Sequence, residues 1–459
     1  RGGDGDDVFL DRGGNDVIDG GFGKDTLDGA AGADDYIVTP EIFNGDEDKR
    51  IGEGFESGDA ITDTGTSGSE IDQVFIEDGK GARVTDVGEN SVDFTDGTLS
   101  GIEEVLYADR NDDGTADHTG NDRFVDVTSD QFDSVDLFKG STGNNDRLEI
   151  NFLNNADTES QPTVDDIEDV VLDTSGDGTA GESNVIDAGG ITRDAIVYVR
   201  GDEGDNNDVL KVSDLQADLD ADGDTFDDGY GSVYDGELDI TLLADTNNDV
   251  SIETGSNDTS VTTRSNTTAT VDAEHLANGK TLDLDGVDDI VVNKAGTITV
   301  DASNDLDGGI FDSDSNELSG TLVVNAKTAA DVTLLTGRSQ TTFDGDSGTA
   351  EVDATQLRDD VLLTLKGSSD VTVEELVGDV NATASSGVID ITSAVDAGDD
   401  SASGDDDIDI STGSDDMRIR GTEGGGATIN VDAAVMDTGD ALTIGDQSDF
   451  VVTNVGSSV

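Results

Sequence analysis

Four aspartates near the N-terminus carry the clearest chemical pattern in the chain. Asp7, Asp16, Asp25 and Asp34 recur every nine residues, and glycines stand ahead of each of them. Glycine allows positive φ in a tight turn, which lets carbonyl oxygens face a common centre, and aspartate adds a hard anionic oxygen. This donor set predicts calcium sites and not zinc or copper sites.

An apolar residue follows each of these aspartates by two positions. Read in nines from Gly2, the sequence is GGDGDDVFL, DRGGNDVID, GGFGKDTLD and GAAGADDYI, which places Phe9, Ile18, Leu27 and Tyr36 in phase. A flexible Gly/Asp linker has no reason to keep this phase. The stretch from residue 2 to 37 resembles the RTX (repeats-in-toxin) nonapeptide G-G-x-G-x-D-x-U-x, whose repeats form a calcium-binding parallel β-roll.

The match to the nonapeptide varies along this stretch. The units that begin at Gly2 and Gly20 match fully, the unit at Asp11 keeps only its second glycine pair, and the unit at Gly29 has Ala30 in place of a glycine. In such a roll alternate nonapeptides turn the same edge, so we expect Asp7 to stack over Asp25 and Asp16 over Asp34. Each calcium ion then lies between stacked turns, and the four in-phase apolar residues fill a thin interior.

Further segments have the composition of calcium-binding loops. DRNDDGTADH resembles an EF-hand-type loop without its final glutamate. DLDADGDTFDD has a similar series of alternate aspartates followed by glycine, and it also lacks the glutamate. In GDDDIDISTGSDDMRI a glycine, an aspartate and an apolar residue each recur after nine residues, which makes this segment a third candidate. Phrases like the N-terminal turn also recur around Asp72, Asp146 and Asp208. The additional predicted calcium ligands are Asp109, Asn111, Asp113, Asp117, Asp218, Asp220, Asp222, Asp406 and Asp415.

The composition favours turns and short strands. Of 459 residues only 33% are hydrophobic, and the 107 acidic residues comprise 85 Asp and 22 Glu against 23 Lys and Arg. Aspartate is a residue of turns and calcium loops, whereas a helical acidic surface would use glutamate. A net charge of −84 implies cations or high salt and argues against binding to nucleic acid or anionic lipid. Cysteine is absent, so ions or continuous β-stacking must stabilise the fold.

Repeated phrases organise the C-terminal half. Segments beginning VDA occur at Val271, Val352 and Val431, at spacings of 81 and 79 residues. The repeat is rich in Val, Ile, Leu and Thr alternating with Asp and Ser, which favours stacked β-coils. The stretch 254–270 is nearly free of apolar residues, which predicts a boundary or an exposed loop.

These patterns predict an all-β fold, a calcium-binding β-roll followed by an elongated repetitive β-solenoid; tandem β-sandwich domains of about 80 residues remain the alternative. The expected domains are a roll at 1–38, an irregular β-rich region at 39–265 and a solenoid of roughly 80-residue repeats at 266–459.

Function is expected to be structural. There is no H-E-x-x-H, no G-x-S-x-G and no cysteine nucleophile, so we predict no enzyme activity. The RTX resemblance implies type I secretion, multiple Ca²⁺ ions and an extracellular location, most like an RTX-type surface-layer protein that assembles with itself and contacts cell-surface polysaccharide. No membrane insertion is expected. The stalk of a large RTX adhesin and the non-catalytic module of a secreted RTX enzyme are the alternatives. A chain that opens on Arg1 also suggests a fragment of a longer protein.

Overall fold

The computed structural model places residues of this chain in two compact units, 1–235 and 236–459. The residues it describes are 2–22, 24–38, 41–43, 50–51, 60–62, 73–76, 90–94, 98–100, 102, 104–106, 122–140, 146–152, 162–174, 183–192, 195–200, 209–221, 233–243, 248–264, 267–303, 318, 320–358, 361–394, 407–421, 428–446 and 449–455.

The N-terminal unit is built from stacked short strands. One sheet orders β3 (Val17–Asp19), β6 (Asp35–Val38), β10 (Gln73–Ile76), β13 (Glu104–Leu106), β15 (Leu137–Lys139) and β17 (Thr163–Asp165). A second orders β2 (Val8–Leu10), β5 (Thr26–Asp28), β9 (Ala60–Thr62) and β12 (Thr98–Ser100). A third runs through β11 (Asn90–Asp93), β14 (Asp122–Thr128), β16 (Arg147–Asn151), β18 (Asp169–Asp173), β20 (Ile196–Arg200) and β22 (Asp218–Asp220).

Smaller elements complete this unit. Strand β19 (Ser183–Asp187) pairs with β21 (Val209–Leu215), and β1 (Gly3–Asp4) pairs with β4 (Gly21–Phe22). Strand β7 (Glu41–Phe43) is antiparallel to β8 (Arg50–Ile51) and to β11. The helix α1 (Ser129–Asp133) begins with a capping box between Thr128 and Gln131, and its Phe132 ring stacks on Phe138 at 5.8 Å.

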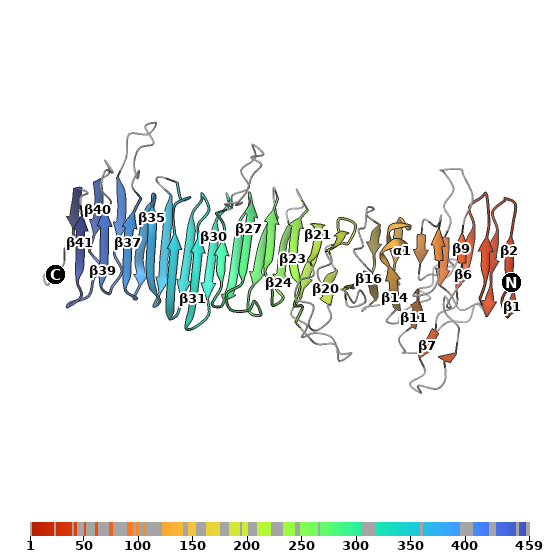
Figure 1. The fold of residues 1–459 in the computed structure, drawn as a ribbon. Helices are drawn as coiled ribbons and strands as arrows, with labels where there is room; N and C mark the ends of the chain where they lie inside the picture. Colours follow the sequence, from red (N-terminus) through yellow and green to blue (C-terminus); the bar gives the residue numbers. More distant parts are fainter. Residues whose placement is uncertain are drawn as a thin grey trace. The chain divides into compact units, whose positions relative to one another are not determined.

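The C-terminal unit has two long sheets (Figure 1). The odd sheet orders β23 (Glu237–Leu242), β25 (Thr259–Thr263), β27 (Thr281–Gly286), β29 (Thr299–Asp301), β31 (Ala330–Leu335), β33 (Gly348–Asp353), β35 (Asp370–Leu376), β37 (Ile389–Ser393), β39 (Met417–Gly421) and β41 (Leu442–Asp446). The even sheet orders β24 (Asn248–Glu253), β26 (Thr267–Asp272), β28 (Ile290–Ala295), β30 (Leu322–Ala326), β32 (Thr341–Gly345), β34 (Leu362–Gly367), β36 (Asp379–Ser385), β38 (Ile408–Ser411), β40 (Thr428–Asp432) and β42 (Asp449–Thr453).

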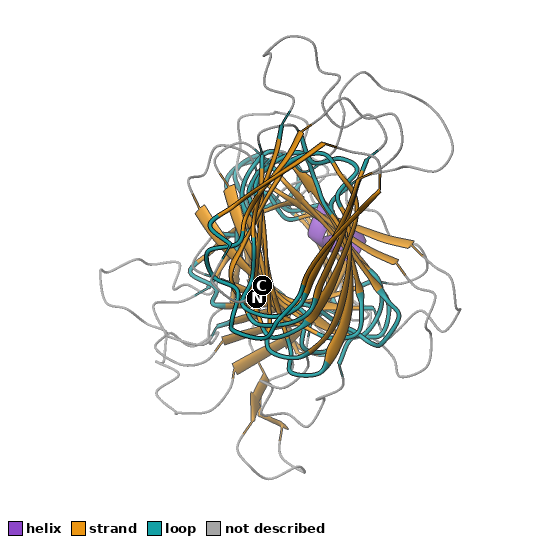
Figure 2. Cartoon of the chain, turned by 90° about the vertical axis from the view of Figure 1, so that its left-hand side faces the viewer, coloured by secondary structure: helices purple, strands orange, loops and turns teal. Residues whose placement is uncertain are grey.

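These sheets make the protein an all-β parallel solenoid, as the sequence predicts. Within each unit the described strands pair in parallel, apart from β7, and each strand pairs with the strand one coil further along the chain, as β26 does with β28. A β-sandwich has antiparallel sheets, so the sandwich alternative is wrong. In the C-terminal unit, which faces the viewer in Figure 2, two layers of strands face each other with loops at their edges.

The alternating sequence explains this packing. Along β25 and β38, for example, inward residues are buried and their neighbours are not. Aliphatic side chains fill the interior, and Asp, Thr and Asn lie on the outer faces. The V-D-A phrases are corners of the coil: at Asp272, Asp353 and Asp432 the carboxylate accepts a hydrogen bond from the backbone N–H two residues later. The alanine of each corner is buried, where a larger side chain would not fit.

One expectation is wrong. The threonine-rich stretch 254–270 is neither a boundary nor an exposed loop, because it forms β25 and the start of β26. Thr259, Thr263 and Thr267 are buried, with exposed fractions of 1–2%. Threonine is β-branched and packs well on a pleated strand, so it replaces valine in these inward positions.

The repeat of about 80 residues spans seven strands. The Val-Asp pair that opens each VDA segment forms the last two residues of strand β26, β33 or β40. These strands are seven apart in chain order. Because seven is odd, β26 and β40 lie in the even sheet and β33 lies in the odd sheet. Equivalent residues of successive repeats therefore occupy opposite faces of the solenoid.

No helix in the described part of the chain is both long and apolar enough to span a membrane.

Candidate calcium-binding sites

The four N-terminal aspartates stack in pairs, as their spacing predicts. The backbone N–H of Asp7 donates to Oδ1 of Asp25, and that of Asp16 donates to Oδ1 of Asp34, each at 2.8 Å and 18 residues apart. Strand β2 pairs with β5 in one sheet, with Val8 opposite Thr26, and β3 pairs with β6 in a second sheet. Two nonapeptides therefore complete one coil, and we call the two stacked pairs the aspartate ladder.

Glycines in the turns leave space for the ladder carboxylates. The second oxygen of Asp7, Asp25 and Asp34 lies where a Cβ would stand on Gly2, Gly20 and Gly29 respectively. The carbonyl oxygen of Gly20 also lies against Gly2. Only glycine leaves room for carboxylate and carbonyl oxygens to converge here, and such a cluster of hard oxygens fits calcium.

Electrostatics in the ladder favour a cation. Asp25 and Asp34 are buried, with 3% and 0% of their surface exposed. Burial raises the pKa of Asp25, and the negative charges of Asp7, Asp6 and Asp19 raise it further, although the hydrogen bond from the Asp7 backbone opposes them. Each cause of the rise penalises the ionised form. A bound divalent cation would remove that penalty.

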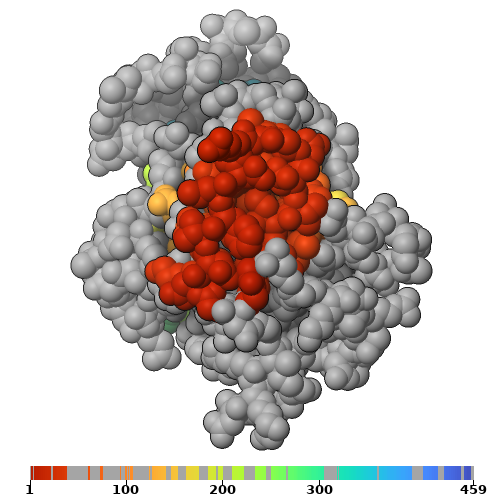
Figure 3. Space-filling view, turned by 90° about the vertical axis from the view of Figure 1, so that its right-hand side faces the viewer, coloured from red at the N-terminus to blue at the C-terminus, as the bar shows by residue number. Residues whose placement is uncertain are grey.

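The interior beneath the ladder is thin. Ile18, Leu27 and Tyr36 are buried and Phe9 is half-buried, as predicted, while Val8 is 67% exposed. The Tyr36 hydroxyl accepts a hydrogen bond from the Gly29 N–H at 2.8 Å. The described residues of 2–38 form a continuous outer surface in Figure 3. Apolar burial alone gives this segment little stability.

The other predicted ligands are only partly described. Asp109, Asn111, Asp113, Asp117, Asp222 and Asp406 lie outside the described residues. Asp218 and Asp220 belong to strand β22 and not to a loop, because the buried Leu219 between them sets a strand alternation. Calcium binding at these positions stays a prediction.

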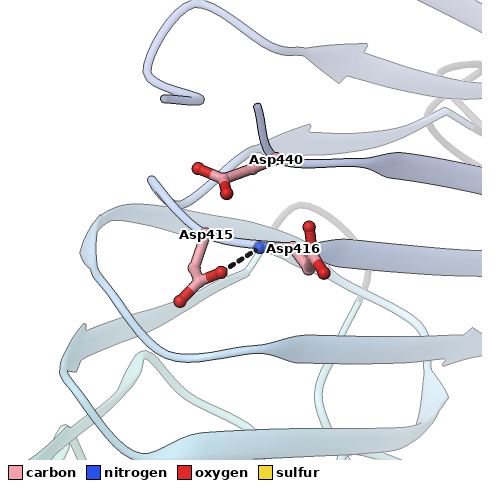
Figure 4. A group of neighbouring side chains, drawn as sticks. All are labelled: Asp415, Asp416 and Asp440. Carbon is pink, nitrogen blue, oxygen red and sulfur yellow. Dashed lines mark hydrogen bonds between the residues drawn. The ribbon is translucent and has the colours of Figure 1, made fainter. Parts of the chain in front are cut away.

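Asp415 lies in a cluster that the sequence did not predict. Ligand oxygens of Asp415, Asp416 and Asp440 all lie within 4.8 Å of one another (Figure 4). Oδ1 of Asp415 accepts from the Asp416 N–H, and Oδ1 of Asp416 accepts from the Ala441 N–H, both at 2.7 Å. Burial raises the pKa of Asp440, and Asp415 and Asp416 add to the rise.

Asp146 was also missed as a candidate ligand. It is fully buried, and its Oδ2 lies 2.8 Å from the position of a Cβ on Gly140. This is the same glycine–aspartate contact as in the ladder. The segment GSTGNNDRLEI could have identified Asp146 as a candidate ligand, because its glycines precede Asp146 in nearly the nonapeptide order.

Aspartates also meet on the outer face of the odd sheet. Asp283 on β27 pairs in register with Ser260 and Asp301, and Ser260 pairs with Asp239. Asp285 also lies on β27. Burial raises its pKa to about 7, and the negative charges of Asp283, Asp301 and Asp239 contribute to the rise. Like charges in directly opposed positions destabilise a sheet.

We expect this group to make stability depend on pH when divalent cations are absent. A carboxyl with a raised pKa in the folded state stabilises the fold below its ordinary pKa, and that stability is lost as pH rises from 3.8 to about 7. The whole shift corresponds to roughly 4 kcal/mol, and solvent screening reduces it to about 1–2 kcal/mol.

The variant Asp285→Asn should therefore unfold at a higher temperature than wild type at pH 8 and show little difference at pH 4. Thermal denaturation followed by circular dichroism measures both. Asp449→Asn, at an exposed position of β42, is the control and should change neither. An equal stabilisation by Asp285→Asn at both pH values would contradict the role of its charge.

No protein-family model, curated protein or solved structure matches this chain.

Proposed function

We propose that this chain is a secreted, calcium-dependent structural protein that assembles with copies of itself into a cell-surface layer or another extracellular coat. The observation that carries the proposal is the aspartate ladder, in which stacked and buried carboxylates share an edge of the coil with glycine turns. Calcium sites in extracellular modules bind with Kd values of about 10⁻⁴–10⁻³ M, so calcium outside a cell would complete the fold.

The distribution of the few basic residues supports a need for added cations. Lys294 bridges Asp272 and Glu274 at 2.8 and 2.7 Å, and Lys139 bridges Asp165 and Asp166 at 2.6 and 3.0 Å. Both lysines neutralise carboxylates from a neighbouring coil. With 107 acidic and 23 basic residues, the chain has too few such bridges for its carboxylates.

The solenoid itself supports a scaffold role. Its outer faces carry Thr, Asp and Asn on regularly spaced parallel strands, and each coil contacts its neighbours along the stack. Repetitive folds of this kind offer extended surfaces. Two such acidic faces repel each other unless cations bridge them. Association should therefore require more calcium than folding does.

A calcium titration tests this function. We expect β-structure to form first, by circular dichroism, and light scattering to rise at higher calcium, with sheets or filaments in electron micrographs. Magnesium at equal ionic strength is the control for charge screening. A protein that stays folded and strictly monomeric at millimolar calcium and high protein concentration would contradict self-assembly and favour the adhesin-stalk alternative.

A further inference from the structure

The seven-strand repeat places one corner of the coil in three equivalent copies. Strands β24, β31 and β38 are each followed by a Thr-Gly pair, and the threonines Thr254, Thr336 and Thr412 are all fully buried. The two residues that end each corner are Asn257 and Asp258 in the first copy, Ser339 and Gln340 in the second, and Asp415 and Asp416 in the third.

A third position joins this corner from the next coil. It is Lys280 before β27, Val361 before β34 and Asp440 before β41, and in each copy its backbone N–H donates to the carbonyl three residues earlier. Strand register gives the same equivalence, since Thr259 pairs with Leu282 as Met417 pairs with Leu442.

Hydrogen bonds match closely between the first and third copies. The N–H of Thr281 donates to Oδ1 of Asp258, and the N–H of Ala441 donates to Oδ1 of Asp416, both at 2.7 Å. The N–H groups of Ala277 and Asp437 donate to the carbonyls of Ser256 and Ser414, both at 3.1 Å. The two corners therefore have the same backbone and differ in their side chains.

Those side chains give the three corners different charges. In the first copy the Lys280 ammonium donates to Oδ1 of Asn257 and, at 3.3 Å, to Oδ2 of Asp258. One positive charge and one negative charge balance there. The second copy, with Ser339, Gln340 and Val361, has no charge at these positions.

In the third copy all three positions are carboxylates. Asp440 stands where Lys280 stands, so the group that supplies a cation to the first corner is replaced by a further anion. The 4.8 Å limit on the distances between the three ligand oxygens suits a metal–oxygen distance of about 2.3–2.6 Å, because two ligands on opposite sides of an ion are twice that far apart.

We propose that the corner formed by Asp415, Asp416 and Asp440 binds one calcium ion in the place that the Lys280 ammonium takes in the equivalent corner. The ion joins the coil of β39 to the coil of β41 and releases the repulsion among three carboxylates. Calcium is favoured over transition metals because the donors are all hard oxygens, and water completes the coordination. The site lies far from the nonapeptides in sequence, so it extends the proposed calcium dependence to the other unit.

Hydrogen–deuterium exchange on the whole chain tests the site locally. Peptides that cover 414–418 and 437–444 should exchange about tenfold more slowly with calcium than with chelator, because the Asp416 and Ala441 amides donate within the cluster. Peptides from 2–38 report the aspartate ladder in the same experiment. A response in 2–38 without one in 414–418 and 437–444 would overturn this proposal and leave the ladder sites standing.

A charge swap supplies the decisive variant. Asp440→Lys places an ammonium group where Lys280 stands in the first corner, and it should give slow exchange in both peptides with or without calcium. The control Asp449→Lys makes the same change in charge at an exposed position and should keep the calcium response. The reciprocal variant Lys280→Asp should create a new calcium response in peptides that cover 256–259 and 277–284. Retention of the wild-type calcium response by Asp440→Lys, or no new response in Lys280→Asp, would refute the equivalence on which the site rests.

Discussion

Removal of calcium is expected to unfold the coils of residues 2–38. The ladder buries Asp25 and Asp34 beside other carboxylates, and the apolar interior beneath them is small, with Phe9 only half-buried. Without a cation, repulsion and desolvation act against a core too thin to resist them. Exchange in peptides from 2–38 should rise to the rate of an unfolded chain on chelation, while strands such as β32 and β35 stay protected.

Two neighbouring aspartates provide a matched pair for this prediction. Asp34 is fully buried and accepts from the Asp16 N–H, whereas Asp35, the first residue of β6, is only partly buried and lies on the face opposite the buried Tyr36. Asp34→Ala should raise the calcium concentration needed for folding by about tenfold or more, which is ~1.4 kcal/mol, and Asp35→Ala should change it little. Equal midpoints for the two variants, or protection of 2–38 in exhaustive chelator, would show that calcium does not act through the ladder.

Acid should partly replace calcium in these coils. Burial and neighbouring charges raise the pKa of Asp25 in the folded state, so its protonation stabilises the fold as pH falls. The same chelated protein should therefore recover protection in peptides from 2–38 on acidification toward the ordinary carboxyl pKa. This gain separates charge repulsion from any other effect of the chelator.

Substitution of Gly32 by alanine is expected to prevent the roll from closing. Gly32 has φ of +143°, and a Cβ there would overlap the carbonyl oxygen of Gly14 in the adjacent coil. That neighbour is backbone, so the coils must separate and break the 2.7 Å hydrogen bond from the Gly14 N–H to the Ala31 carbonyl. Calcium-dependent gain of β-signal from 2–38 should be lost.

Gly14 is the control, because it has a similar φ of +134° but its Cβ position lies 3.7 Å from the nearest atom, Oδ2 of Asp16. Gly14→Ala should therefore show only the backbone strain, about 1–3 kcal/mol, and should still fold when calcium is raised. If Gly14→Ala and Gly32→Ala require the same calcium concentration, close approach of the coils is not what Gly32 provides.

The local pattern was enough to predict the N-terminal coils. The spacing of Asp7, Asp16, Asp25 and Asp34, with an apolar residue two positions after each, implied stacking at 18 residues, and the hydrogen bonds have that spacing. It succeeded because glycine turns, strand alternation and carboxylate position all repeat within nine residues. Similar reasoning failed at 254–270, where composition suggested a loop but inward threonines build two strands.

Sequence alone determined that this chain is acidic, β-rich and repetitive, because alternation, turn residues and charge are local properties that need no partner to be read. Only the tertiary structure decided which residues meet. A repeat of seven strands sets equivalent corners on opposite sheets, and coil closure brings Asp440 to Asp415 and Asp416 as it brings Lys280 to Asp258. The number of strands per repeat and the register between coils depend on how every turn closes, so residues about 25 apart become neighbours only when the coils stack.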